Sequence, residues 1–337
     1  MSNLPPINRN NNFLFHHLYK TETASKNDVK TPFIFELSFL VKHAPNTYKK
    51  IAFQMLEPET YQEKAFQMLE KAINNDSFDS YIKDQHGTPF IFELASLAHY
   101  APYIYKEKTY QWLEKAINND SFDSYIKDQH GTPFIFELAS LAQDVSETHK
   151  EKAFQLLEKA INNDSFDHNI KDQHGTPFIF ELASLAQHAR YTYEEKAFQL
   201  LESAIKKKSF DHNIKDPYGT PFIFELASLA TFDTHKEKAF QLLEKTINND
   251  SFDSYIKDQH GTPFIFVLAS LAQDVSDTHK EKAYQWLEKA INNDSFDPNI
   301  KDRDAKHFIF ELASLAQNAP DTYKEKAYQW LEKAINN

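Results

Sequence analysis

The apolar and polar positions of the chain recur with the period of a helix. In the segment 134–142, apolar residues stand at i, i+1, i+4, i+7 and i+8, the spacing of one helical face: Phe134, Ile135, Leu138, Leu141 and Ala142. Phe136 and Ala139 widen this face and leave Glu137 and Ser140 as a narrow polar stripe. A helix that is apolar on most sides must be covered on most sides.

A second helix, with one apolar and one polar face, is predicted over 148–161. Its inward positions are Ala153, Phe154, Leu156, Leu157, Ala160 and Ile161. Thr148 precedes Glu151 by three residues, the pattern of a capping box, in which each side chain binds the other's backbone amide. For the first helix, we expect Thr132 as the N-cap and Pro133 as the first helical residue.

Close copies of this helix pair recur along the chain. The Phe that opens the first helix falls at Phe33, Phe90, Phe134, Phe178, Phe222, Phe264 and Phe308, with gaps of 57, 44, 44, 44, 42 and 44 residues. The period predicts about seven units, which start near residues 31, 88, 132, 176, 220, 262 and 306. One helix pair cannot bury its apolar surface alone, so neighbouring copies must stack. The sequence therefore predicts an all-α fold, a right-handed αα-hairpin solenoid forming one domain over 31–337. A polar segment, 1–30, precedes it and contains a capping helix.

Two places depart from the repeat. The first gap is 13 residues longer than the others because Ala52–Glu57 recurs as Ala65–Glu70, and Pro58 between the copies predicts two short helices. All five glycines stand just before the Thr of a first helix, which predicts a turn with positive φ. In the last unit, Asp304-Ala305-Lys306-His307 replaces that tract, so we expect a different turn there.

Composition narrows the classes of function. The net charge is −12, with 49 acidic and 37 basic residues, which argues against nucleic acid as a partner, since phosphate binding needs clustered positive charge. The chain has no cysteine, which excludes a disulfide scaffold and thiolate metal sites. It has no apolar run long enough for a membrane span and no secretory signal, so we expect a cytoplasmic protein. No P-loop, glycine-rich dinucleotide turn or His-Glu-x-x-His motif occurs, and we expect neither catalysis, nor a cofactor, nor a metal.

One glutamate position recurs on the first helices and is the first candidate site. It is occupied by Glu36, Glu93, Glu137, Glu181, Glu225 and Glu311, with Val267 as the exception. Two interpretations stay open. A carboxylate near a helix N-terminus is favoured by the helix dipole. Alternatively, the row, with Glu93, Glu137, Glu181 and Glu225 at its centre, forms an acidic groove for a basic partner.

Histidines and tryptophans are the other candidates. His130 and His174 belong to a row, with His86 and His260, that we place at the turn tips, too far apart to share a metal ion. They either contact a partner or simply recur with the repeat. Trp112 and Trp286 replace a leucine of the second helix and are either core residues or anchors for a partner. The loops between the two helices differ from unit to unit, for example His99–Tyr103, through drift or partner recognition.

The tract Asp128-Gln129-His130-Gly131-Thr132-Pro133, with the Leu156-Leu157 pair of the second helix, resembles the ankyrin repeat. The resemblance covers about 31–337, but these units have about 44 residues, whereas ankyrin repeats have 33, and Ile135 stands at the family's usual His. HEAT-like helical pairs fit the length as well. The resemblance implies a non-catalytic scaffold that binds a protein partner through its loop tips and first helices.

Several functions remain compatible with this scaffold. One form is a bacterial effector or modulator that acts inside a host cell. An alternative is a structural protein that self-associates through the C-terminal end. A HEAT-like nucleic-acid-binding protein or enzyme is the third hypothesis.

Overall fold

The computed structural model describes most of the chain after residue 29. The described residues are 30–43, 61–75, 77–162, 166–189, 191–207, 210–211, 213–231, 236–248, 252–274, 277–293 and 295–336. They fall into two compact units, Met1–His130 and Gly131–Asn337. The expected capping helix and the duplicated segment around Pro58 lie outside the described residues. The boundary of a single domain at 31–337 stays a prediction.

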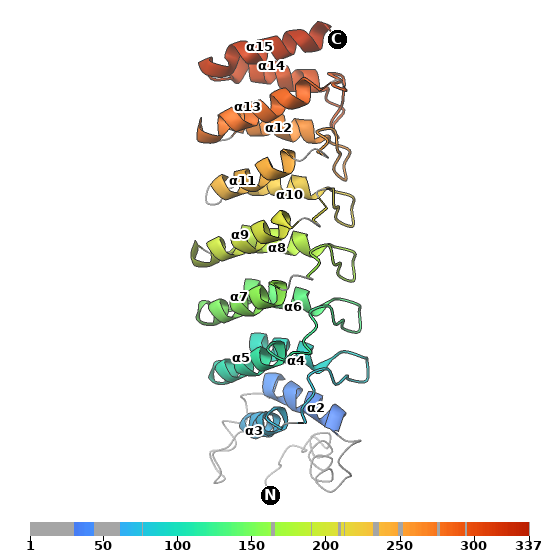
Figure 1. Ribbon diagram of the computed structural model, residues 1–337, viewed down its shortest axis with the longest axis vertical. Helices are drawn as coiled ribbons and strands as arrows, with labels where there is room; N and C mark the ends of the chain where they lie inside the picture. The colour runs from blue at the N-terminus through green and yellow to red at the C-terminus, as the bar shows by residue number, and fades with distance from the viewer. Residues whose placement is uncertain are drawn as a thin grey trace, which may run out of the picture. The chain divides into compact units, whose positions relative to one another are not determined.

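The described chain contains 14 helices and isolated β-bridges, but no extended strand. Unit one holds two hairpins: α2 (Lys30–His43) with α3 (Tyr61–Ile73), and α4 (Phe90–Tyr100) with α5 (Tyr103–Ile117). Unit two holds five: α6 (Phe134–Asp144) with α7 (Glu147–Ile161), α8 (Phe178–His188) with α9 (Tyr191–Lys206), α10 (Phe222–Leu229) with α11 (Lys236–Ile247), α12 (Phe264–Asp274) with α13 (Asp277–Ile291), and α14 (Phe308–Asn318) with α15 (Asp321–Asn336). Within unit two the hairpins stack in sequence order, with all loops between hairpins on one side (Figure 1). The all-α hairpin solenoid is confirmed.

The core is built from the apolar faces that the sequence predicted. In α6, Phe134, Ile135 and Leu138 are fully buried, and Phe136 is 8% exposed. In α7 the buried set is Ala153, Phe154, Leu156, Leu157, Ala160 and Ile161. Burial of each large side chain contributes roughly 1.5–3 kcal/mol.

Phenylalanine rings join the first helices of neighbouring hairpins in unit two. The pairs Phe136–Phe178, Phe180–Phe222, Phe224–Phe264 and Phe266–Phe308 each meet edge to face at 5.1 Å between centroids. This geometry brings the positive edge of one ring to the negative face of the next. The first helices α8, α10 and α12 are therefore covered from both sides, which explains why their polar stripe is so narrow.

The expected helix caps are wrong. From α4 onward the first helices begin at the Phe, with Pro133 at the N-cap position of α6 and no capping side chain. In α7 the helix begins at Glu147, so Thr148 lies in the first turn, where its hydroxyl contacts Ser146 and His149 instead of forming a capping box. The backbone at Pro133 is extended (φ −65°, ψ 146°) and belongs to the loop that joins two successive hairpins, which we call a hairpin loop. This loop holds Thr132 away from the end of the helix.

Each hairpin loop closes on one aspartate. Asp172 donates its backbone N–H to Thr176 O at 3.0 Å, and its Oδ1 accepts the N–H groups of His174 and Thr176 at 2.8 and 2.7 Å. Gly175 follows with φ 85°, and all five glycines have φ between 85° and 92°, which confirms the predicted turn.

The last loop keeps this turn, so the prediction of a different one is wrong. Asp302 N–H binds Lys306 O at 3.0 Å, and Asp302 Oδ1 accepts the amides of Asp304 and Lys306. Ala305 takes the glycine position with φ 61°. The aspartate bonds therefore define the turn, and glycine only relieves it of strain.

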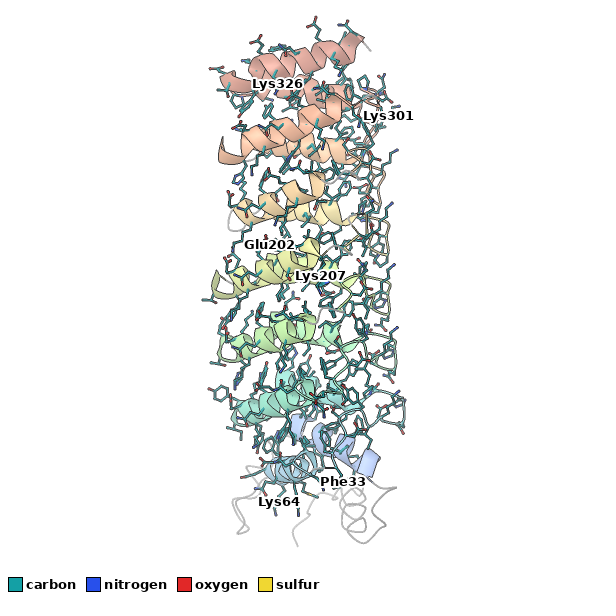
Figure 2. The ribbon with its side chains drawn as sticks, in the orientation of Figure 1. Phe33, Lys64, Glu202, Lys207, Lys301 and Lys326 are labelled. Atoms are coloured by element: carbon teal, nitrogen blue, oxygen red, sulfur yellow. The ribbon has the colours of Figure 1, made fainter. Side chains whose placement is uncertain are left out.

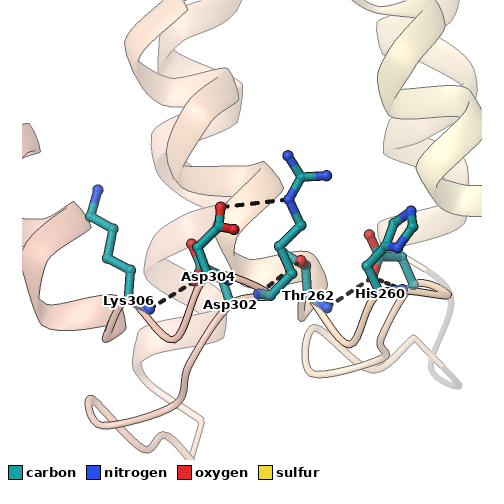
Figure 3. A network of polar contacts seen from close by, with 7 residues as sticks. His260, Thr262, Asp302, Asp304 and Lys306 are labelled. Carbon is teal, nitrogen blue, oxygen red and sulfur yellow. Dashed lines mark hydrogen bonds and ion pairs between the residues drawn. The ribbon is translucent and has the colours of Figure 1, made fainter.

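The threonines before three of the first helices, Thr88, Thr220 and Thr262, link neighbouring loops. Thr262 Oγ1 accepts the Arg303 N–H at 3.3 Å (Figure 3), and Thr220 Oγ1 accepts the Gln259 N–H at 3.3 Å. In unit one, Thr88 Oγ1 accepts the Gln129 N–H at 3.2 Å. The hydroxyl that the sequence suggested as a helix cap is thus a bridge between repeats.

Candidate functional site

The first helices of unit two turn one polar stripe to solvent, which we call the helix-one face. Its members are Glu137, Ser140, Glu181, Ser184, Glu225 and Ser228, on α6, α8 and α10. Glu137 is exposed, whereas Glu181 and Glu225 are half-buried. Helices that pack side by side lie roughly 8–10 Å apart, which sets the spacing of the carboxylates along the face.

Glu181 and Glu225 are electrostatically strained. Burial raises the pKa of Glu181, and the nearby carboxylate of Asp172 raises it further. Burial also raises the pKa of Glu225, with a further contribution from Asp216 and a smaller opposing one from His188. Among the described residues, neither carboxylate forms an ion pair with a Lys or Arg. The charged form of each is therefore less favourable in the folded than in the unfolded chain.

Two glutamates at the same repeat position have cations beside them. In unit one, Glu93 accepts the ammonium of Lys42 at 2.7 Å and the Ser38 hydroxyl at 3.0 Å. In the last hairpin, Glu311 pairs with Lys306. The dipole interpretation applies to all the glutamates equally, whereas half-burial without a lysine or arginine beside it in the described chain distinguishes Glu181 and Glu225.

The candidate histidines lie at the tips of the hairpin loops, as predicted. His130 and His174 are exposed, and their Nε2 atoms contact the amides of Gln129 and Gln173 at 2.9 and 3.1 Å. No three His, Asp or Glu side chains gather as metal ligands in the described part of the chain. The histidine side chains at the tips are accessible for contact with a partner.

The candidate tryptophans are core residues. Trp112 is 2% exposed and stacks on Phe66 at 4.9 Å. Trp286 is 5% exposed and stacks on Phe240 at 5.6 Å. Of the two interpretations given above, their burial favours the packing role.

The end of α4 and the start of α5 carry exposed apolar side chains. Tyr100, Tyr103 and Ile104 are 64%, 72% and 75% exposed. At the position of Ile104, the second helices of unit two carry threonine: Thr148, Thr192, Thr278 and Thr322. This variation was visible in the sequence, but the exposure of the side chains was not.

A ladder of ion pairs on the second helices was not predicted. Lys245, Lys282 and Lys326 reach Glu202, Glu244 and Glu288 of the preceding hairpin at 2.6, 2.7 and 2.6 Å. Figure 2 shows Lys326 on this side of the stack and Lys301 among the hairpin loops. Exposed pairs contribute about 0–1 kcal/mol each, so the ladder fixes register more than stability. The sequence signal was a glutamate at one fixed position of every second helix, with lysines at two fixed positions: Lys282 and Lys326 share one, and Lys245 holds the other.

No described helix is long and apolar enough to cross a bilayer.

Six segments of the chain match the model of the Sel1 repeat: residues 62–77, 106–121, 150–165, 194–209, 278–295 and 320–337. Each match falls on the second helix of a hairpin and the turn beside it. The chain is a helical repeat protein.

Other comparisons of this helical repeat protein are more distant. A solved structure described as EF0377, an ankyrin repeat protein, is similar with a TM-score of 0.39 and 12% sequence identity, over 67% of this chain and 90% of that chain. No curated protein matches the sequence.

Proposed function

We propose that this helical repeat protein is a non-catalytic scaffold that binds a basic protein partner on the helix-one face of unit two. The Sel1 repeat matches support the general role, because proteins with this repeat typically mediate protein–protein interactions. The observation that carries the site is the pair Glu181 and Glu225, half-buried carboxylates without a lysine or arginine beside them in the described chain.

A lysine or arginine from a partner would relieve this strain. The pKa of each carboxyl is raised by burial, so its negative charge at neutral pH destabilises the folded chain. A partner cation restores the favourable interaction that desolvation removed, and a partly buried pair gains more from it than an exposed one.

The narrower forms of the proposal are an ankyrin-like mode of contact through the loop tips and an effector role in a host cytoplasm. The first is supported by the exposed tips at His130 and His174, the second by composition alone.

The test replaces the two carboxylates by their neutral isosteres, Glu181→Gln and Glu225→Gln. The position tolerates a neutral residue, since Val267 occupies it in α12. We expect the double variant to melt at the same or a higher temperature than the wild type. Its affinity for the partner, identified by pull-down and mass spectrometry, should fall about tenfold or more.

The matched control removes two charges elsewhere, with Glu158→Gln and Glu332→Gln on exposed positions of second helices. It should bind the partner as the wild type does. Equal loss in both double variants would mean that only net charge matters, and unchanged binding by the helix-one variant would overturn the site.

A further inference from the structure

Unit one shows how a lysine binds to the polar stripe of a first helix. The Nζ atom of Lys42, on α2, lies 2.7 Å from Glu93 Oε2 and 3.0 Å from Ser96 Oγ, both on α4. The side chains of Lys42 and Glu93 are 10% and 28% exposed. An ammonium has three N–H donors, so one lysine can serve the carboxylate and the hydroxyl at the same time. The glutamate and the serine of one first helix therefore form a site for an ammonium.

The same two acceptors recur on α8 and α10 in unit two. They are Glu181 with Ser184, and Glu225 with Ser228, each pair three residues apart like Glu93 and its serine. Residues three apart are neighbours on the surface of a helix, so each carboxylate lies on the same side as its hydroxyl. Within the described chain, neither serine hydroxyl has a hydrogen bond. We call these two pairs the Glu–Ser subsites.

The residue that supplies the cation in unit one is neutral in unit two. Gln143 and Gln187 hold the repeat position of Lys42 on the first helices that precede α8 and α10. The other serine that donates to Glu93, at 3.0 Å, has alanine at its position on the same two helices. A glutamine amide carries no charge, so the chain keeps the acceptors of the site in α8 and α10 and supplies no lysine to them.

We propose that the two Glu–Ser subsites bind two lysine ammonium groups of the partner, one on each first helix. The inference rests on the proposed function, because it names the cation that the helix-one face selects. Packed helices lie roughly 8–10 Å apart, which sets the spacing of the two ammonium groups. Two lysines seven residues apart on an α-helix meet this requirement, since they lie on one side of the helix and roughly 10.5 Å apart along its axis.

The test uses a helical, alanine-rich peptide with two lysines seven residues apart, and the same peptide with trimethyl-lysine at both positions. Trimethylation keeps the positive charge and removes the N–H donors. Binding to the full chain is measured by isothermal titration calorimetry at low ionic strength. We expect the wild type to bind the lysine peptide about fivefold more tightly than the trimethylated one, because only the ammonium can donate to the serines.

The double variant Ser184→Ala and Ser228→Ala should lose this preference and bind both peptides equally. Alanine is the best helix former, so the variant should melt as the wild type does. Ser270→Ala is the matched control, since Ser270 holds the same repeat position on α12, where Val267 replaces the glutamate. The control should keep the fivefold preference.

The outcomes separate this inference from the proposed function. A serine double variant that keeps the preference for lysine would overturn the Glu–Ser subsites, as would a wild type that binds neither peptide. The proposed function is tested independently, by whether Glu181→Gln with Glu225→Gln lowers the affinity for the protein partner captured by pull-down. Loss of that partner without a serine effect would leave the carboxylate site standing and reject the lysine subsites alone.

Discussion

At the scale of single residues, burial of a titratable group has the clearest consequence at His168. This side chain lies in the loop before α8, is 4% exposed, and its ring meets Phe166 edge to face at 4.8 Å. Its Nε2 has no hydrogen-bond partner among the described residues. Burial lowers the pKa of His168 to about 4, with Lys207 contributing and Asp167 opposing. The imidazole is therefore neutral in the folded chain at every pH above about 4.

The sign of the resulting pH dependence follows from linkage. The folded-state pKa lies below the ordinary value of 6.5, so acid favours the unfolded chain, which binds the proton more readily. The contribution of His168 is complete above pH 6.5 and is lost as the pH falls to 4, by about 3 kcal/mol. Urea denaturation of the wild type and of His168→Ser at pH 7, 5.5 and 4 measures it.

The variant is matched to the repeat, because Ser80, Ser124 and Ser254 hold this position in other units and are buried there. His168→Ser should have the stability of the wild type within about 1 kcal/mol at pH 7 and should lose less of it at pH 4. Parallel losses in the two proteins would show that the buried imidazole does not govern the acid sensitivity.

At the scale of elements, the hairpin loop is held by its aspartate and by the threonine bridge to the next loop. Ala305 shows this most directly, because it adopts φ 61° where the other loops have glycine. A left-handed conformation costs a residue with a Cβ about 1–2 kcal/mol, and the greater freedom of glycine in the unfolded chain offsets about 0.5 kcal/mol of the gain on substitution. Ala305→Gly should therefore stabilise the chain by roughly 0.5–1 kcal/mol, measured by urea denaturation.

The reverse change tests the same cause. Gly261 has φ 86°, and a Cβ added there would meet no atom within 4 Å, so Gly261→Ala probes the backbone alone. It should destabilise the chain by a similar amount. If both changes stabilised the chain, or if neither did, the positive φ at this position would not be what sets the stability of the loop.

At the scale of the whole molecule, the helix-one face is a surface that three successive hairpins of unit two build together. The helix-one face carries carboxylates whose burial raises their pKa, and we propose a basic protein for it.

The sequence by itself determined the repeat, the two helices of each hairpin and their buried faces. The repeat period and the spacing of apolar residues can be read directly from the sequence. The apolar face formed by Phe134, Ile135 and Leu138 can be buried only if neighbouring repeats stack on it. The glycine turns were also predictable, because positive φ selects glycine strongly.

Only the tertiary structure decided where the polar groups of the repeat find their partners. The hydroxyl of Thr262 suits a helix cap as well as a bridge, and the position of the next loop selects the bridge to the Arg303 amide. The sequence presents Glu93 and Glu181 as equivalent, yet Lys42 neutralises the first and no such cation lies beside the second in the described chain. The sequence allowed Trp112 to be either a core residue or an anchor for a partner, and the burial of its side chain favours the core. Hydrogen bonds and ion pairs depend on distances between repeats, and a repeating sequence gives each copy the same residues but not the same surroundings.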